Sequence, residues 1–397
     1  MVQGGGLSPD ARRIIAAQGA RALAYGLGSV LIGVTLARRG LSNTTVGALL
    51  AALLAGTAIV SVLIARYADR VGRRRCYRVL FLLMAVAGTV FALTSWLPAL
   101  FLAGLTGTVS TDVVESGPFT SLEQAMLPHA GASATRLFGT YNTVATLAGS
   151  VGALIALAGS SPKLLLAYPV AATGGLLASA RLSPAVEHGH ELEAEIRPPL
   201  HRSRGLVLRL SGLFALDSFG GGFVPQTFIA YLFARKFGAS PHTLAVVFFA
   251  IGILQAVSFQ AAVRIAGKIG LLRTMVFSHL PSNLLLIAVA FAPNLASAIA
   301  LLLARFALSQ MDVPTRQAYV MGVVDPSERT AAAAYTNTAR YLARPVAPLI
   351  AGAALRGALG APFFIAGTLK CVYDGGLYLL FRHVELPAPE ANAPVNV

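Results

Sequence analysis

Long apolar runs recur along the whole chain, and they constrain its fold more than any other feature. A helix needs about 20 mostly apolar residues to cross the hydrocarbon layer of a membrane. Of the 397 residues, 56% are hydrophobic and only 12% are charged, far from the balance of a soluble domain. The runs predict an all-α integral membrane protein with twelve transmembrane helices. They lie at residues 14–37, 44–65, 79–97, 98–126, 137–160, 164–181, 206–234, 242–263, 273–292, 294–321, 330–355 and 361–381.

The distribution of Lys and Arg predicts how these spans are oriented. With a cytoplasmic N-terminus, most of the 31 Lys and Arg fall on the cytoplasmic side, which is the asymmetry that membrane insertion produces. We therefore expect a multi-pass protein of the cytoplasmic membrane, surrounded by lipid, with both termini cytoplasmic. The net charge of +15 would also suit nucleic acid, but a nucleic-acid-binding protein has no reason to place its arginines in alternate loops. We expect no nucleic-acid partner.

The chain contains an internal repeat on either side of one hydrophilic segment. The segment, at 180–205, is rich in Pro, Glu, Arg and His and divides the spans six and six. "EQAMLPHAGASATR" (123–136) matches "RQAYVMGVVDPSER" (316–329) at an offset of 193, and "DRVGRRR" (69–75) matches "GKIGLLR" (267–273) at an offset of 198. The repeat predicts two pseudo-symmetric six-helix halves, at 1–181 and 206–397, joined by a cytoplasmic linker at 182–205.

The basic stretch "ARYADRVGRRR" (65–75) carries a recognisable motif between the second and third spans. Asp69, Arg70, Gly72 and the following arginines resemble the loop 2–3 signature of the major facilitator superfamily, with Ala65 in place of its first glycine. The resemblance covers essentially the full chain and implies a secondary transporter that works by alternating access. It says nothing about the substrate.

The resemblance also implies a cytoplasmic gating motif. Asp69 would face the N-terminal end of span 11, and Arg73 would reach an acid at the cytoplasmic end of span 4, here Glu123. Gly72 allows a sharp reversal between two antiparallel helices. The arginines, Arg70 among them, either latch one conformational state or only set the topology.

Ionisable residues inside spans are costly and mark candidate functional positions. In the family fold, spans 1, 4, 7 and 10 line a central cavity, and all four contain charged residues here. We expect no ionisable residue in the interiors of spans 2, 3, 5, 6, 8 and 9. The polar residues predicted to line a substrate or proton pathway are Arg21, Tyr25, Asp112, Glu115, Asp217, Gln226, Arg305, Asp312, Arg340 and Arg344.

Asp112 and Glu115 are three residues apart and share one helix face. Two adjacent carboxylates in a low dielectric repel each other, so that one holds its proton, which suits proton coupling. Alternatively, Arg21 or Arg305 neutralises them in a static ion pair. The offset of 193 places Asp112 opposite Arg305 and Glu123 opposite Arg316, which suggests ion pairs across the interface between the halves.

Two further pairs lie four residues apart. Arg340 and Arg344 share a face of span 11. They either bind an anionic substrate or form ion pairs with Asp312 or Asp217. Lys370 and Asp374 on span 12 suggest a self-satisfied structural pair.

These features together predict a carrier that works as a monomer. We expect proton-coupled efflux of a small organic molecule, a drug or a metabolite, by an antiporter. The alternative is proton-linked uptake or uniport of an anionic metabolite. The chain shows no phosphate-binding loop, nucleophile elbow or zinc spacing, so we expect no cofactor, no metal and no enzymatic activity. A polytopic membrane enzyme remains the distant alternative.

Overall fold

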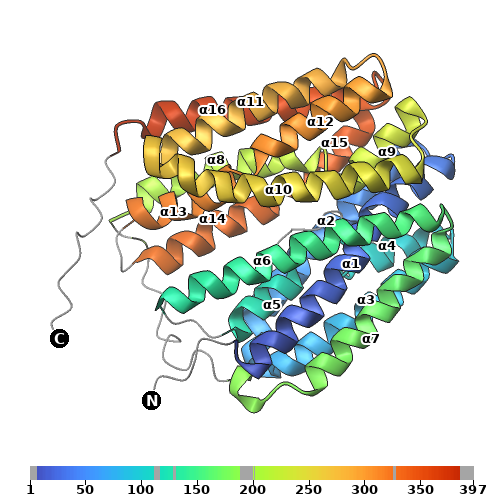
Figure 1. The fold of residues 1–397 in the computed structure, drawn as a ribbon, viewed down its shortest axis with the longest axis horizontal. Helices are drawn as coiled ribbons and strands as arrows, with labels where there is room; N and C mark the ends of the chain where they lie inside the picture. Colours follow the sequence, from blue (N-terminus) through green and yellow to red (C-terminus); the bar gives the residue numbers. More distant parts are fainter. Residues whose placement is uncertain are drawn as a thin grey trace.

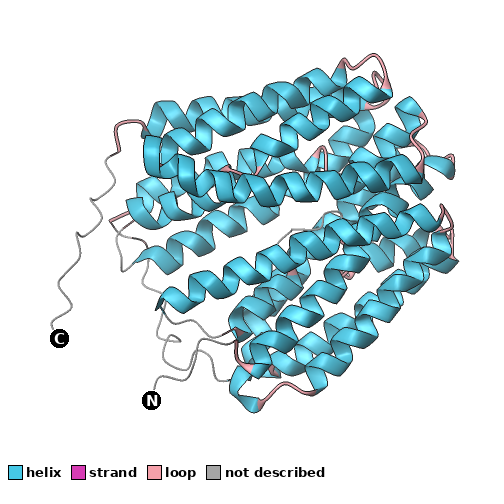
Figure 2. Ribbon diagram, in the orientation of Figure 1, coloured by secondary structure: helices cyan, strands magenta, loops and turns pink. Residues whose placement is uncertain are grey.

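The computed structural model describes residues 7–110, 117–127, 131–187, 200, 202–324 and 328–384. The secondary structure of these residues is entirely helical, which confirms the all-α prediction (Figure 2). Within these described ranges, ten helices are long and apolar enough to cross a membrane. This number fits the twelve predicted spans, because spans 4 and 11 are built from shorter pieces.

The N-terminal helices lie together in the lower part of Figure 1, coloured blue to green. They are α1 (Pro9–Arg38), α2 (Asn43–Val71), α3 (Arg73–Leu93), α4 (Leu97–Leu105), α5 (Pro118–Met126), α6 (Gly131–Leu154), η1 (Ile155–Ala158), η2 (Pro162–Leu166), α7 (Ala167–Ala180) and η3 (Pro184–Glu187).

The C-terminal helices lie above them, coloured from yellow-green to red (Figure 1). They are α8 (Arg204–Gly222), α9 (Gln226–Phe237), α10 (Pro241–Ile269), α11 (Leu271–Ala290), α12 (Leu295–Ser309), α13 (Asp312–Val323), α14 (Arg329–Ala343), η5 (Arg344–Val346), α15 (Ala347–Ala354) and α16 (Ala361–Phe381).

The turn between α2 and α3 differs from the expected loop. The basic stretch from 65 to 78 is helical except at Gly72, which has φ +101° and ends α2 while preceding α3. An L side chain rarely adopts this backbone conformation, so glycine is required for the reversal. Gly270 makes the same turn between α10 and α11, with φ +87°. The two halves therefore share this turn at the predicted offset.

Four of the predicted spans are interrupted. Span 7 breaks between α8 and α9 at Phe223–Pro225, and span 10 breaks between α12 and α13 at Gln310–Met311. Span 4 consists of α4 and α5, and span 11 consists of α14, η5 and α15. The sequence predicts a break in each of these four spans, at "ESGPF" (115–119), "DSFGGGFVP" (217–225), "MDVP" (311–314) and "RPVAP" (344–348). Proline lies beside these breaks because it removes a backbone donor and clashes with the preceding turn.

The two bundles contact each other near one end of the molecule. We call the end with Gly72, Glu187 and Arg204 the linker end, and the opposite end, with Asn43 and Leu355, the far end. α1 packs on α9, α2 on α15 and α6 on α10. At the far end, Tyr231 donates a hydrogen bond to Asn43 Oδ1 (2.8 Å), and Asn43 donates to the carbonyl of Leu355 (3.4 Å).

Close backbone approach supports this contact between α2 and α15. A Cβ added at Gly47 would lie 2.4 Å from the carbonyl oxygen of Pro348, and one added at Gly352 would lie 2.6 Å from that of Asn43. Only glycine permits helices to pack at this distance.

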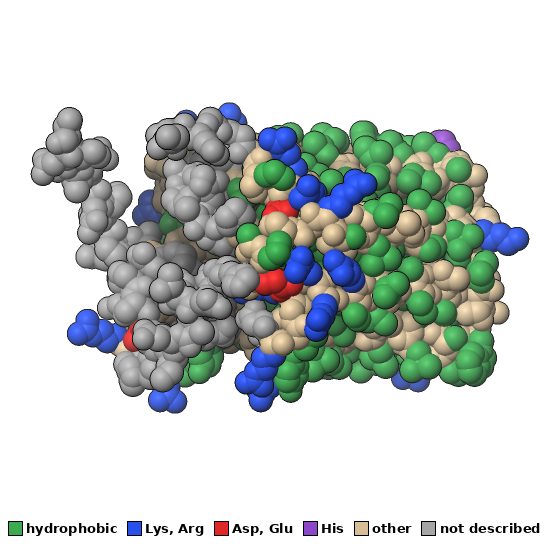
Figure 3. All heavy atoms as spheres, turned by 90° about the horizontal axis from the view of Figure 1, so that it is seen from below, with side chains coloured by type: hydrophobic (Ala, Val, Ile, Leu, Met, Phe, Trp, Pro, Cys, Tyr) green, Lys and Arg blue, Asp and Glu red, His purple; other side chains and the backbone are tan. Residues whose placement is uncertain are grey.

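The surface has the character expected of a membrane protein. Figure 3 shows largely hydrophobic side chains over one face, with Lys and Arg gathered toward the linker end. Large exposed apolar residues such as Val86, Leu102 and Val170 lie on the outside of the bundle. Such a surface is suited to contact with lipid.

Candidate functional site

A polar cavity lies within the C-terminal half, beside the breaks in spans 7 and 10. Its volume is about 250 Å³, and its lining comes from α8, α9, α10, α11, α12, α13, α14, η5 and α16 and from the break residues. Non-helical backbone at membrane depth is tolerated where it is buried in protein or lines a water-filled cavity. The charged or ionisable side chains of the lining are Asp217, His279, Arg305, Asp312, Arg316, Arg340, Arg344 and Lys370.

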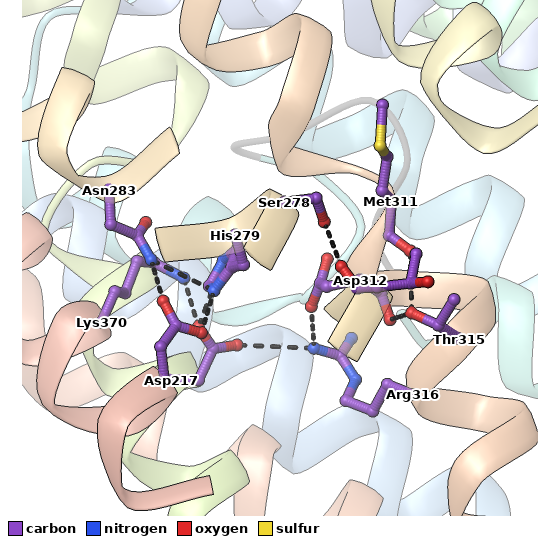
Figure 4. Close-up of polar contacts among 11 residues, drawn as sticks. Asp217, Ser278, His279, Asn283, Met311, Asp312, Thr315, Arg316 and Lys370 are labelled. Atoms are coloured by element: carbon purple, nitrogen blue, oxygen red, sulfur yellow. Dashed lines mark hydrogen bonds and ion pairs between the residues drawn. The ribbon is translucent and has the colours of Figure 1, made fainter. Parts of the chain in front are cut away.

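Asp217 on α8 is the centre of the ionic contacts in this cavity (Figure 4). Its Oδ1 lies 2.5 Å from Lys370 Nζ and 3.9 Å from His279 Nε2, and its Oδ2 lies 3.6 Å from a nitrogen of Arg316. The side chain is 5% exposed. A carboxylate buried to this degree is tolerated because cations surround it.

Arg316 joins Asp217 to a second carboxylate. It donates a hydrogen bond of 2.6 Å to Asp312, four residues earlier on α13. Both side chains are at most 6% exposed. Arg316 therefore bridges α8 and α13 beside the break in span 10.

A third carboxylate lies behind the cavity, between α11 and α16. Asp374 is fully buried, and its Oδ1 lies 2.9 Å from His279 Nδ1. Asn283, one turn along α11, donates to Asp374 Oδ2 at 2.8 Å. His279 thus stands between Asp374 and Asp217, with one ring nitrogen toward each.

Three further arginines line the same cavity. Arg305 lies over the ring of Phe306, with 4.5 Å between its guanidinium carbon and the ring centre. Arg340 is within electrostatic range of Arg316, Asp217 and Asp312, and its backbone carbonyl accepts a hydrogen bond from Ser218 (2.8 Å). Arg344 begins η5, directly after α14. Gln226 lines the cavity at the first residue of α9.

The N-terminal half contains a compact ionic cluster instead. Arg21 on α1 donates a hydrogen bond of 2.7 Å to Glu123 on α5, and Tyr77 donates to the other oxygen of Glu123, also at 2.7 Å. Tyr141 also donates to Glu123. Arg21 is 5% exposed and Glu123 is fully buried. Tyr25 lies beside Arg21 and donates to the carbonyl of Thr108 (3.0 Å).

The pairing across the interface that the repeat suggested is not what these residues form. Glu123 binds Arg21, and Arg316 binds Asp312 and Asp217, so these two residues pair within their own bundles. Asp112, the other suggested partner, lies outside the described residues. Glu123 of span 4 and Arg316 of span 10 correspond at the offset of 193, and each pairs with an opposite charge on the first span of its own half, Arg21 or Asp217. A buried ion pair requires opposite charges on its two partners, but either partner can carry the positive charge.

The structure describes the side chains of Arg70 and Arg73 in the gating motif. Arg73 was expected to reach Glu123, but it donates to the carbonyl of Ala125 (2.8 Å) at the same helix end, and Glu123 is held by Arg21. Arg70 is exposed. The side chain of Asp69 lies outside the described residues, as do Asp112 and Glu115.

Glu187 of the linker caps the start of α3, a contact that sequence analysis missed. Its carboxylate accepts hydrogen bonds from the backbone N–H groups of Arg73 (2.6 Å) and Arg74 (3.2 Å) and from Arg74 Nε (3.0 Å). Partial burial would raise the pKa of Glu187, but these hydrogen bonds outweigh it and hold the pKa below its usual value. The linker is therefore tied to the basic motif.

His279 of span 9 was not predicted from the sequence, nor were the partners of Lys370 and Asp374 on span 12. His279 contradicts the interpretation of span 9 as free of ionisable residues, and Lys370 and Asp374 bind Asp217 and His279 rather than each other. The available signal was the spacing of four between His279 and Asn283 and between Lys370 and Asp374, which places each pair on one helix face. Which helix faced them could not be read from spacing.

Comparison with known proteins assigns the chain to a family. A curated yeast relative, the uncharacterized membrane protein YJR124C of Saccharomyces cerevisiae, is 26% identical over 426 residues, and the alignment covers 95% of both chains. The crystal structure of a D-xylose–proton symporter superposes with a TM-score of 0.71 at 16% identity, over 93% of this chain and 97% of that one. The human organic anion transporter MFSD10 gives a TM-score of 0.63 at 16% identity, over 93% and 99%. The profile of the Major Facilitator Superfamily matches residues 14–348. The chain is therefore a multi-pass membrane protein that belongs to the major facilitator superfamily.

Proposed function

We propose that this protein carries a small organic anion across the membrane, with the cavity of the C-terminal half as its binding site. The observation that carries the proposal is the charge of the cavity lining. Among the described residues, five cationic side chains and two carboxylates line it, an excess of three positive charges whatever pairs they form. Burying like charges together is costly unless an anion compensates them.

The types of side chain also support an anion. Four of the five cations are arginines, whose planar guanidinium groups match carboxylate and phosphate geometry. Arg305, Arg340 and Arg344 reach the cavity from α12, α14 and η5, so they surround a ligand from different helices. The fold is shared with an organic anion transporter, which is compatible with the proposal.

The size of the cavity favours a metabolite over a large drug. Pockets for drug-sized ligands span about 300–1,000 Å³, and this one is about 250 Å³. The anionic alternative from sequence analysis therefore gains support over drug export. Direction of transport and the monomeric state remain predictions from the sequence.

Closure at the far end supports alternating access as the mechanism. The contacts of Gly47 with Pro348 and of Asn43 with Tyr231 join the two bundles there. For a substrate to leave toward that side, these contacts would have to break. At Gly47 the backbones of α2 and α15 lie against each other without interlocking side chains. The bundles can therefore separate there as rigid bodies.

Counterflow in liposomes tests the proposal. Purified protein is offered labelled mono- and dicarboxylates and sugar phosphates beside neutral sugars and nucleosides. We expect counterflow of an anion, and in Arg340→Gln a rise of its KM by about 10- to 100-fold, since hydrogen bonds to charged groups contribute about 1.5–3 kcal/mol. Arg356→Gln, at an exposed arginine of the far end, is the control and should leave KM unchanged.

Two results would contradict the proposal. One is counterflow of a neutral solute only, with a KM that Arg340→Gln leaves unchanged. The other is chemical conversion of the solute without its transport, which would favour the membrane enzyme over the carrier.

A further inference from the structure

The buried cluster behind the cavity has a charge that is not balanced within itself. It consists of Asp217, Asp312 and Asp374 with Lys370 and Arg316, and it surrounds His279. Three carboxylates face two cations, so the cluster has one negative charge when His279 is neutral. One added proton makes it neutral. Ionic groups at this depth are stable only when their charges compensate.

His279 is placed to hold that proton. A carboxylate accepts hydrogen bonds but donates none, so His279 Nδ1 carries a hydrogen toward Asp374 at 2.9 Å. The other ring nitrogen, Nε2, lies 3.9 Å from Asp217 Oδ1. In neutral imidazole its lone pair would face a carboxylate, whereas in the protonated ring an N–H would face it. Protonation therefore replaces a repulsion by an attraction.

All neighbouring elements contribute to this environment. Tyr373 lies edge-on to the His279 ring, at 5.8 Å between ring centres, and Asn283 of the same helix lies 3.1 Å from Nδ1. From α10, uncharged Gln255 and Phe259 line the cavity. The charged groups around His279 or lining the same cavity are Asp374 and Lys370 of α16, Asp217 of α8, Asp312 and Arg316 of α13, Arg305 of α12, Arg340 of α14 and Arg344 of η5.

Arg340 connects this cluster to the proposed anion site. It lines the cavity and is within electrostatic range of Asp217 and Asp312, so its charge offsets the excess negative charge while the cavity holds no anion. An anion bound to Arg340 cancels that effect. The bound anion makes the electrostatic potential at the cluster more negative, which favours uptake of one proton.

We infer that His279 and Asp374 form a proton-binding site on spans 9 and 12, and that proton and organic anion bind together. The inference rests on the proposed anion site and extends it to the coupling ion. Because coupling between two binding sites is reciprocal, the proton strengthens anion binding by the same factor as the anion strengthens proton binding. Because each of the two ligands strengthens binding of the other, proton and anion cross the membrane together in the same direction.

Accumulation assays separate coupling from transport. In proteoliposomes, the anion identified by counterflow is supplied outside with a lower external pH, and its internal concentration is followed with an internal pH dye. We expect the wild type to accumulate the anion while the interior acidifies. His279→Gln should retain counterflow but only equilibrate the anion, without acidification. His242→Gln, at an exposed histidine on α10, is the matched control and should accumulate as the wild type does.

Proton-coupled accumulation by His279→Gln equal to that of the wild type would overturn the inference. If His279→Gln does not fold, calorimetry of the wild type decides instead. Anion binding measured in two buffers of different ionisation enthalpy gives the protons taken up, and no uptake at any pH would also overturn the inference. Failure of the proposed function is a different result, in which the wild type shows no counterflow of any anion.

Discussion

Replacing Glu123 by glutamine tests whether the ionic cluster of the N-terminal half is a structural element. The change leaves the guanidinium of Arg21 without its anionic partner at 2.7 Å, and the side chain of Arg21 is only 6% exposed. It also weakens the hydrogen bonds from Tyr77 and Tyr141, which now share a neutral acceptor. Breaking a buried pair by neutralising one partner costs about 3–5 kcal/mol. We expect Glu123→Gln to lose this much free energy of unfolding.

The assay is unfolding by SDS in mixed micelles, followed by circular dichroism. Arg21→Met combined with Glu123→Gln should recover much of the loss, because neither charge then remains buried. Arg13→Gln is the matched control, since Arg13 pairs with Asp10 at 3.0 Å but is 38% exposed, and exposed pairs contribute about 0–1 kcal/mol. Equal stability of Glu123→Gln and Arg13→Gln would refute the reasoning, as would a double variant that is less stable than Glu123→Gln.

Two other predictions concern the far end and the linker. Gly47→Ala should push α2 away from the carbonyl of Pro348 and favour opening at the far end, detected as faster labelling of a cysteine introduced there. Gly174→Ala, with open space around it, should not change the labelling. Because the pKa of Glu187 is lowered in the folded state, its contribution is present above its unfolded pKa of about 4.3 and is lost as pH falls through the folded value. The difference in stability between wild type and Glu187→Gln should therefore be constant near neutral pH and shrink in acid; a difference that grows in acid would contradict this.

The pattern of charges in the spans predicted a part of the site. Asp217, Gln226, Arg305, Asp312, Arg340 and Arg344 were selected because ionisable or polar groups are costly in a membrane, and the structure places all six in one cavity. Arg21 and Tyr25 were selected on the same grounds, but they belong to the buried cluster of the N-terminal half. The energetic cost of burial shows that a polar residue in a span needs a polar environment. It does not show whether that environment is a cavity or a closed ionic cluster.

The positions of the membrane spans were predicted more completely than the ion pairs between side chains of different spans. Hydrophobic runs of about 20 residues are sufficient to predict spans. In lipid, each span must form its backbone hydrogen bonds within itself, as a helix does. Partners depend on which helix faces which, so spacing alone paired Lys370 with Asp374, whereas the structure pairs them with Asp217 on α8 and His279 on α11.

The amino-acid sequence by itself determined the membrane class, the spans, the repeat and the turn at Gly72, because each follows from local composition or from backbone geometry at one residue. Only the tertiary structure decided that Glu123 binds Arg21 and that His279 stands between Asp217 and Asp374. The physical reason is that Coulomb interaction depends on the distance between side chains in space. Those distances arise when helices far apart in the chain pack together.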